Sequence, residues 1–339
     1  ALTYIIKSNW LEVLNMAEII GIDLGTSSTR IYIKSKKAVI FDEPTCLSID
    51  IKTDQIVNIG YLAFKSLGRT PYGIEVEFPM KEGVVADIQS AYQLIDQVFQ
   101  NRGKKRMLRG ASFYVSAPNQ MTNVEKNALI DVFKKIEARE IILQPCGKLA
   151  ALGAGYDVNS PTGTIILDIG GGISDCGAVS MGDIVVAHST KVGGKEFDHV
   201  IERYIKNKKN LDIGPRASEQ VKARIASVNP KAENQFYEVS GRNISTGLPS
   251  TAIISTAELY PLLRQLIDQI EDNVKEVIQD IPSEMVGDIV KSGIILTGGG
   301  SQIAGMKETL QSDLKIPVNQ IKDPSNAVIL GLAKMIEQE

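Results

Sequence analysis

The sequence predicts an α/β protein made of two similar domains that face each other across a cleft, and two observations carry this prediction. The first is an internal duplication: IIGIDLGTSSTRIYI and IILDIGGGISDCGAV each contain an apolar strand, an aspartate, a glycine turn and a second apolar strand. The two aspartates, Asp23 and Asp168, lie 145 positions apart, close to half of the chain. The second is the length of 339 residues, which exceeds what one hydrophobic core usually serves.

The first half of the chain alternates strand and helix patterns. Residues 18–34 indicate strand, polar turn and strand, because Ile31 and Ile33 alternate with polar or mixed neighbours after the turn. The later elements are an interrupted strand over 38–50, short strands with turns over 51–85, a helix over 87–99, a buried strand over 113–118, an amphipathic helix over 123–136, a strand over 140–145 and a helix end over 149–155.

The second half repeats this order. Its long helix, over about 256–281, has apolar residues at helical spacing along its whole length. The other elements are strand, glycine turn and strand over 164–180, a strand over 184–188, helices over 195–206 and 215–228, a strand-prone section over 229–254, and strand, glycine loop and helix start over 293–306.

Composition narrows the classes of function. A net charge of −3 offers no general attraction for nucleic acid. The cysteines Cys46, Cys146 and Cys176 are odd in number and include no CxxC pair, which argues against a disulfide framework or a zinc site and fits a reducing cytosol. No run of about eighteen apolar residues occurs, so the sequence predicts no membrane-spanning helix.

Residues 1–17 are predicted to be an N-terminal extension or an amphipathic segment. An amphipathic helix here would lie on a membrane surface. The alternative is an upstream extension, because MAE at 16–18 resembles the start of a protein. Four apolar residues would share one face of the helix: Leu2, Ile6, Trp10 and Val13.

The two glycine turns are candidate phosphate sites, and their context excludes two common phosphate motifs. A P-loop of the form GxxxxGK[ST] is absent, and a dinucleotide fingerprint needs a helix after its glycines. Both turns are followed by strand patterns, so we expect β-hairpin tips. Backbone N–H groups and Ser or Thr hydroxyls at such tips bind phosphate, and two facing tips clamp a triphosphate. The aspartate before each tip suits hydrated Mg²⁺.

At these motifs the chain resembles the MreB family of bacterial actins, within the superfamily of actin, chaperone ATPases and sugar kinases. IGIDLGTSSTRIYIKSKKAVIFDEPTCLSI carries the likeness, which continues through VSAPNQMTNVEKNAL, SPTGTIILDIGGG, VGGKEFDHVIERYI and SGIILTGGGSQIAGM. The resemblance implies an actin-like fold: two duplicated α/β domains around a nucleotide cleft, each with a smaller subdomain. The implied domains are 18–155 and 156–339, with small subdomains at about 35–83 and 215–254.

The resemblance also implies the residues that hold ATP or ADP. Asp23 and Asp168 would hold Mg²⁺, mostly through water. The first phosphate loop would comprise Asp23, Gly25, Thr26, Ser27 and Ser28, and the second Asp168, Gly170, Gly171 and Gly172. Ribose and adenine would contact Glu219 and Lys222, and the adenosine would be flanked by Gly298, Gly299, Gly300, Gln302 and Ile303.

The sequence departs from this family at two positions that matter for hydrolysis. An ungapped register places the family's hydrolytic glutamate at Cys146 and its threonine after the triple glycine at Ile173. A thiol is mostly neutral near pH 7, and isoleucine cannot hydrogen-bond, so we expect at most a slow ATPase. The alternatives are that Ser174 or Asp175 partly replaces the missing groups, or that a local gap brings Gln144 into position.

The loop RGKKRMLRG, at 102–110, is a candidate membrane contact. Two apolar residues ringed by cations suit insertion into an anionic leaflet, and the corresponding family loop carries a membrane-contacting pair. The alternative is a solvated basic loop whose apolar pair packs inward. The residues concerned are Met107 and Leu108 with Lys104, Lys105, Arg106 and Arg109.

The resemblance predicts a cytoskeletal function over the alternatives. We expect ATP-binding, head-to-tail protofilaments in the cytoplasm, peripheral at the inner face of the cell membrane, that act in cell shape or cytoskeletal organisation and bind no nucleic acid. One alternative is a sugar-kinase or acetate-kinase type of phosphotransferase, which needs a catalytic carboxylate in the cleft. Another is a non-hydrolysing modulator of filaments made by a sibling actin homologue.

Overall fold

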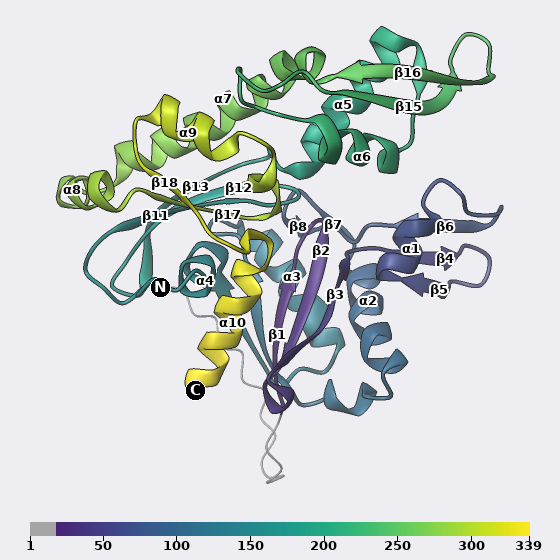
Figure 1. Ribbon diagram of the computed structural model, residues 1–339. Helices are drawn as coiled ribbons and strands as arrows, with labels where there is room; N and C mark the ends of the chain where they lie inside the picture. The colour runs from purple at the N-terminus through teal and green to yellow at the C-terminus, as the bar shows by residue number, and fades with distance from the viewer. Residues whose placement is uncertain (1–17) are drawn as a thin grey trace.

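The computed structural model describes residues 18–339, so the predicted N-terminal amphipathic segment lies outside the described residues. Each half of the chain builds one five-stranded sheet (Figure 1). The first sheet, in the order β10-β9-β1-β2-β3, contains β1 (Ile19–Leu24), β2 (Ser28–Ile33), β3 (Ala38–Pro44), β9 (Ser112–Ala117) and β10 (Glu140–Pro145). The second, in the order β13-β12-β11-β17-β18, contains β11 (Thr164–Ile169), β12 (Ser174–Ser180), β13 (Asp183–Thr190), β17 (Ile294–Thr297) and β18 (Val318–Gln320).

The two sheets have the same topology, which confirms the predicted duplication. In the first sheet, β1 pairs antiparallel with β2 and parallel with β9. In the second, β11 pairs antiparallel with β12 and parallel with β17. The strands that carry the two aspartates are therefore equivalent central strands, and the turn after each aspartate is a hairpin tip, as predicted.

Helices cover the outer face of each sheet. Alternate residues of β1, such as Ile20 and Ile22, pack against α2 (Ile88–Asn101) and α3 (Asn123–Lys135). The outer face of the second sheet packs against α5 (Gly194–Lys209), α7 (Thr256–Asp280), α8 (Ser283–Ser292) and α9 (Met306–Leu314). The α7 helix begins with a capping box, because Ser255 and Glu258 each bond the other's backbone N–H.

The inner faces of both sheets share one core around two crossing helices. Helices α4 (Cys146–Gly153) and α10 (Ala327–Gln338) pack with Tyr32 and Tyr114 from the first sheet and with Ile166 and Ile295 from the second. The central strands β1 and β11 are therefore buried on both faces, which explains their nearly continuous apolar sequences. Because α10 follows the second sheet in sequence and packs on β1, the chain crosses back to the first domain at its end.

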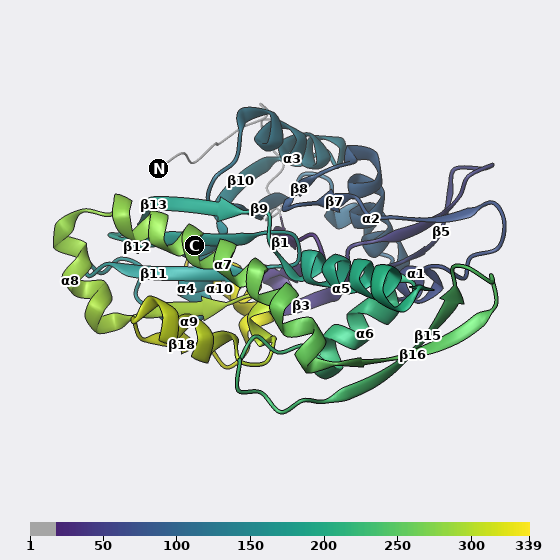
Figure 2. The ribbon, with the colours of Figure 1, turned by 90° about the horizontal axis from the view of Figure 1, so that it is seen from above.

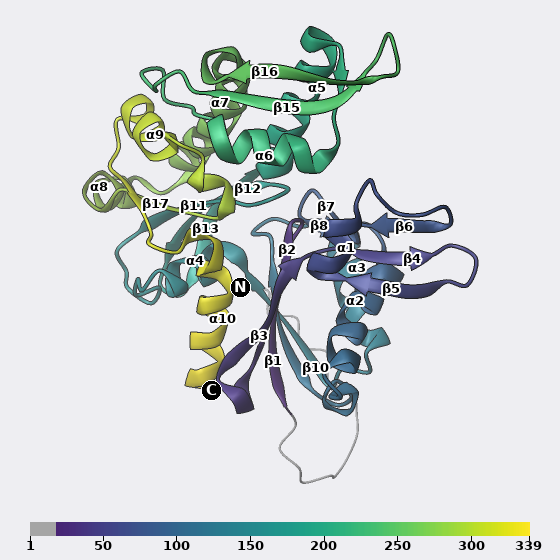
Figure 3. The same ribbon diagram turned by 45° about the vertical axis from the view of Figure 1, so that its right-hand side comes forward.

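Each domain carries a smaller unit, and both units lie at the same end of the molecule (Figures 1 and 3). The first contains β4 (Leu47–Asp50), β5 (Gln55–Ile59), α1 (Gly60–Ser66) and β6 (Ile74–Glu77), next to the hairpin of β7 (Met80–Lys81) and β8 (Val84–Val85). The second contains β14 (Leu211–Asp212), α6 (Pro215–Ile225), β15 (Phe236–Asn243) and β16 (Pro249–Ser255).

Several elements differ from the sequence prediction. Helices α1, α8 and α10 lie in segments for which periodicity predicted no helix. The helix predicted over 215–228 ends at Ile225, because Ala226 adopts an extended conformation. The glycine loop after β17 forms a 3-10 turn over Gly299–Gln302, and α9 begins only at Met306. Among residues 18–339, no helix has the length and apolar character needed to cross a bilayer.

Glycine permits the close crossing of α4 and α10. A Cβ atom on Gly153 would lie 1.9 Å from the carbonyl oxygen of Ala327, and one on Gly331 would lie 1.9 Å from that of Leu149. Backbone atoms occupy both positions, so a rotamer change cannot relieve either clash. The crossing that joins the two domains therefore requires both glycines.

We predict that Gly331→Ala lowers the free energy of unfolding by about 2 kcal/mol or more, because its methyl group would push the two helices apart. Gly287→Ala in α8 is the matched control, since nothing lies within 4 Å of a Cβ there. The control should be neutral or stabilising by up to about 1 kcal/mol through helix propensity. Urea denaturation measures both variants, and equal effects would contradict the crossing argument.

Candidate nucleotide-binding site

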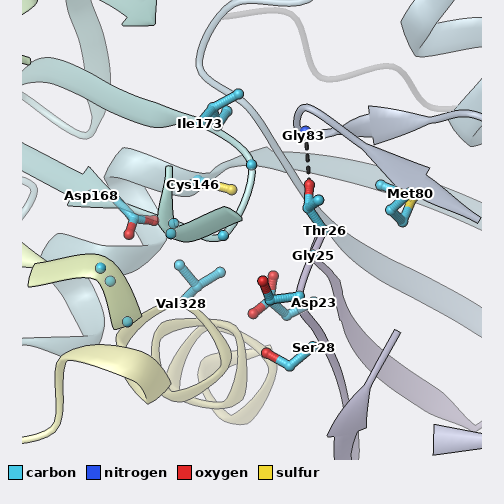
Figure 4. Close-up of a pocket in the computed structure, with 18 of the residues that line it drawn as sticks. Asp23, Gly25, Thr26, Ser28, Met80, Gly83, Cys146, Asp168, Ile173 and Val328 are labelled. Atoms are coloured by element: carbon cyan, nitrogen blue, oxygen red, sulfur yellow. Dashed lines mark hydrogen bonds between the residues drawn. The ribbon is translucent and has the colours of Figure 1, made fainter. Parts of the chain in front are cut away.

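A cavity of about 380 Å³ lies between the two hairpin tips (Figure 4). Its lining includes both predicted phosphate loops, both aspartates, Glu219, Lys222, the triple glycine at 298–300 and Ile303. Gln302 is the exception: it lines an adjoining pocket of about 330 Å³ and donates a hydrogen bond to Ser325 Oγ at 2.7 Å. The structure thus gathers the predicted residues, except Gln302, around one cavity.

The two hairpin tips close with the same backbone hydrogen bond. The N–H of Gly25 donates to the carbonyl of Ser28 at 3.1 Å, and the N–H of Gly170 donates to that of Ile173 at 2.9 Å. In β11–β12, as in β1–β2, the turn leaves neighbouring backbone N–H groups available to an anion. This repetition gives each domain an equivalent candidate for binding phosphate.

The tips also touch each other, and glycine is required where they do. A Cβ atom on Gly171 would lie 2.0 Å from Ser27 Oγ, and one on Gly172 would lie 2.4 Å from Thr26 Oγ1. Thr26 Oγ1 in turn accepts a hydrogen bond from the N–H of Gly83, in the β7–β8 turn, at 2.8 Å (Figure 4). The glycines of the second loop therefore provide space for the hydroxyls of the first.

Three carboxyl groups concentrate negative charge at the cavity: Asp23 and Asp175 are buried and Asp168 is half-buried. Burial raises the pKa of Asp168 to about 7, with the carboxyls of Asp175 and Asp23 adding to the effect. Burial also raises the pKa of Asp23, although Arg30 and the hydrogen bond from Ser116 Oγ at 2.7 Å oppose it. Such a cluster favours a divalent cation. Within residues 18–339 no three His, Cys, Asp or Glu side chains are grouped so that they could hold a metal ion directly.

Asp175 is buried and fully engaged, although it lines the cavity. Its carboxylate accepts the N–H of Asn119 at 2.8 Å and Ser189 Oγ at 2.6 Å. Burial raises its pKa to about 6, against the opposing effect of these bonds. Ser174 is engaged too, since its hydroxyl donates to the carbonyl of Val192 at 2.6 Å.

Cys146 and Ile173 both line the cavity (Figure 4). Cys146 is the first residue of α4, and burial raises the pKa of its thiol well above the ordinary value, with Asp23, Asp168 and Asp175 adding to the effect. Its side chain is therefore a neutral thiol. Ile173 packs on the backbone of the β7–β8 turn, because a Cβ on Gly83 would lie 2.8 Å from Ile173 Cδ1.

In the structure, the basic loop at 102–110 does not present its apolar pair for insertion into a membrane. Leu108 is only 2% exposed and belongs to the core of the first domain, and Met107 is partly buried against the same core. Lys105 pairs with Asp96 at 2.9 Å, and Arg109 pairs with Glu137 at 3.4 Å. The inward-packing alternative is the one observed, because the short 3-10 turn over Lys105–Met107 turns the apolar pair toward the sheet-covering helices.

Sequence reasoning missed several residues at the cavity. Ser116, Arg30, Met80 and Gly83 line it without having been predicted. Ser116 had a sequence signal, since it lies near the carboxyl end of a strand parallel to β1. The signal for Gly83 was absent, because the short β7–β8 hairpin reaches the cavity only through the tertiary fold.

Comparisons with known proteins agree with the interpretation of this geometry. The chain matches the family model described as MreB/Mbl protein over residues 17–339. It is 33% identical over 318 residues to the cell shape-determining protein Mbl of Bacillus subtilis strain 168, covering 94% of this chain and 95% of that protein. It is 31% identical over 325 residues to the cell shape-determining protein MreB of Escherichia coli K12, covering 94% and 93%.

Solved structures define the class. MreB 5 of Spiroplasma citri bound to AMPPNP has a TM-score of 0.90 at 33% identity, covering 96% of this chain and 97% of that one. A MamK double helical filament has a TM-score of 0.77 at 19% identity, covering 94% and 98%, and shows the shared fold alone. Duplicated sheets with facing hairpin tips thus define an actin-like protein. More narrowly, the chain belongs to the MreB/Mbl family of cell shape-determining bacterial actin homologues.

We predict that the stability of the nucleotide-free protein falls between pH 5 and pH 8 partly because of Asp168. A carboxyl whose pKa rises from 3.8 to about 7 on folding stabilises the fold below pH 4, and this contribution is lost as the pH rises through about 7. We therefore compare the free energy of unfolding of Asp168→Asn with that of the unmodified chain at each pH. Between pH 5 and pH 8 this difference should shift in favour of the variant by on the order of 1 kcal/mol or more. Denaturation at both pH values tests this, and a gain independent of pH would contradict it.

Proposed function

We propose that this chain is an ATP-binding, filament-forming cytoskeletal protein that acts in cell shape or cytoskeletal organisation and hydrolyses ATP slowly or not at all. The observation that carries the proposal is the pair of equivalent hairpin tips around a cavity with buried carboxyls. AMPPNP and ADP occupy the two MreB 5 structures of Spiroplasma citri, at 33% and 34% identity to this chain, which supports an adenine nucleotide. Asp23 and Asp168 would hold Mg²⁺, which would offset phosphate charge.

Slow hydrolysis follows from the groups that the cavity lacks. A water attacking the terminal phosphate needs a side chain that orients it and accepts hydrogen bonds. The Cys146 thiol is short and neutral, and Ile173 is apolar. Ser174 and Asp175, the alternatives considered from sequence, already bond Val192, Asn119 and Ser189. The same engagement of Asp175 weighs against its acting as the base of a kinase-type reaction, while Asp168 and Glu219 would be taken up by Mg²⁺ and ribose in the proposed function.

We predict that Cys146→Glu with Ile173→Thr raises the rate of phosphate release by about 100-fold, because orienting groups of this kind lower the barrier by about 2.7 kcal/mol. The assay is phosphate release with ATP and Mg²⁺, and Cys146→Ser is the control that restores no carboxylate. Turnover by the unmodified chain equal to that of Mbl from Bacillus subtilis would refute the proposal of slow hydrolysis.

Self-assembly needs two complementary ends, and the second domain offers them. The β15–β16 tip lies at one end of this domain and α8 at the other (Figures 1 and 2). Leu248 at the tip is 65% exposed, and Val290 on α8 is 61% exposed. Exposed Lys208 lies near the tip and exposed Glu284 on α8, so apolar contact and opposite charge favour head-to-tail stacking of copies.

We predict that Leu248→Asp and Val290→Asp each abolish pelleting of filaments in the presence of ATP, because each blocks one end with a buried charge. Mixing the two variants should yield dimers, since each retains one intact end, but no filaments. Val124→Asp is the control, because this side chain is 78% exposed and belongs to α3, a helix that lies away from both ends (Figure 2). Unchanged pelleting of either end variant would exclude this interface.

We also propose a peripheral position at the inner face of the cell membrane. The exposed cations of loop 102–110 and the apolar positions of residues 1–17 support an anionic surface as partner. Since Leu108 belongs to the core, electrostatic attraction by the loop is the relevant contribution in this conformation.

A further inference from the structure

Lys195 joins the two phosphate loops. It is the second residue of α5, and its backbone N–H donates to the carbonyl of Gly171, in the second loop, at 2.9 Å. Its side-chain Nζ reaches across to the first domain and donates to the carbonyl of Thr26, in the first loop, at 2.9 Å. One residue therefore bonds a tip of each domain at the same time.

The side-chain ammonium of Lys195 makes its contacts with the first domain. Nζ lies 4.6 Å from the centre of the Phe78 ring, which also belongs to the first domain. Burial lowers the pKa of Lys195, and among the described residues no carboxylate forms an ion pair with it. Lys222 provides the contrast, because its ammonium bonds Gly194 and Asp198 within the second domain, at 2.8 Å in each case.

We propose that Lys195 is a positioning residue that holds the two phosphate loops at the spacing required by the triphosphate. Lys195 does not line the cavity, so it acts through Thr26, whose hydroxyl is held by Gly83 and whose carbonyl is held by Lys195. The inference rests on the proposed nucleotide-binding function and adds a residue outside the predicted phosphate loops. Retention of ATP, but not recognition of adenosine, depends on it.

Lys191 provides a matched control. Its Nζ also crosses between the domains, where it pairs with Glu82 at 2.7 Å. The Lys191 side chain is 80% exposed, however, and exposed ion pairs contribute little. Loss of a charge-assisted hydrogen bond from a partly buried group has a larger effect than loss of such an exposed ion pair, typically about tenfold or more in an equilibrium constant.

The experiment compares Lys195→Met, Lys195→Arg and Lys191→Met with the unmodified chain, using a fluorescent nonhydrolysable ATP analogue with Mg²⁺. We expect Lys195→Met to release the analogue about tenfold faster or more, and Lys191→Met to stay within about twofold. Lys195→Arg should restore most of the retention, because a guanidinium also donates to Thr26 and stacks on Phe78. Affinity for adenosine, which lacks phosphates, should be unchanged in all variants.

The outcomes distinguish failure of the proposed nucleotide-binding function from failure of the positioning role of Lys195. If the unmodified chain binds no analogue, both the proposed function and the role of Lys195 are wrong. If it binds and Lys195→Met behaves like Lys191→Met, or loses adenosine equally, only the role of Lys195 is wrong. If Lys195→Met does not fold, Phe78→Leu replaces it: we expect about two- to fivefold faster release from loss of the cation–π contact, and unchanged release would overturn the role.

Discussion

The close approach of the two hairpin tips is the constraint on which the rest of the structure depends. The glycines of the second tip leave room for the Ser27 and Thr26 hydroxyls of the first, so the second tip contributes no side chain to the contact between them. The backbone N–H groups of both domains thereby face one small cavity. Neighbouring elements position these tips: β1 and β11 carry the aspartates, and α5 and the β7–β8 turn hold the outer sides of the tips.

The position of the cavity wall also depends on how the two domains join. Helices α4 and α10 cross between the sheets at Gly153 and Gly331, and the first residue of α4, Cys146, lines the cavity. A shift at the crossing therefore moves the cavity wall. In a protein proposed to bind ATP and form filaments, this shared core would link a bound phosphate to the relative position of the two domains.

Under the proposed function, the cavity would hold a nucleotide rather than cleave it. Burial, with a further contribution from the carboxyls of Asp175 and Asp23, raises the pKa of Asp168, so a cation that offsets this charge is favoured. The groups nearest to where a water would be activated are a neutral thiol and an isoleucine that packs on Gly83. A filament subunit with such a site would remain in its nucleotide-bound form for longer, which suits a scaffold that persists.

The sequence by itself determined the duplicated domains, the hairpin nature of both glycine turns and the two candidate phosphate loops. These depend on local patterns, namely strand alternation around a glycine turn, and these patterns survive without knowledge of distant contacts. Glu219, Lys222 and the glycines at 298–300 were expected only from the resemblance to a family. Tertiary structure alone decided the burial of Leu108. The sequence pattern of a short basic loop is the same whether its apolar residues face solvent or the core. Tertiary structure also decided the crossing at Gly153 and Gly331 and the bond from Lys195 to Thr26, since each joins residues more than 150 positions apart and no local pattern records such a contact.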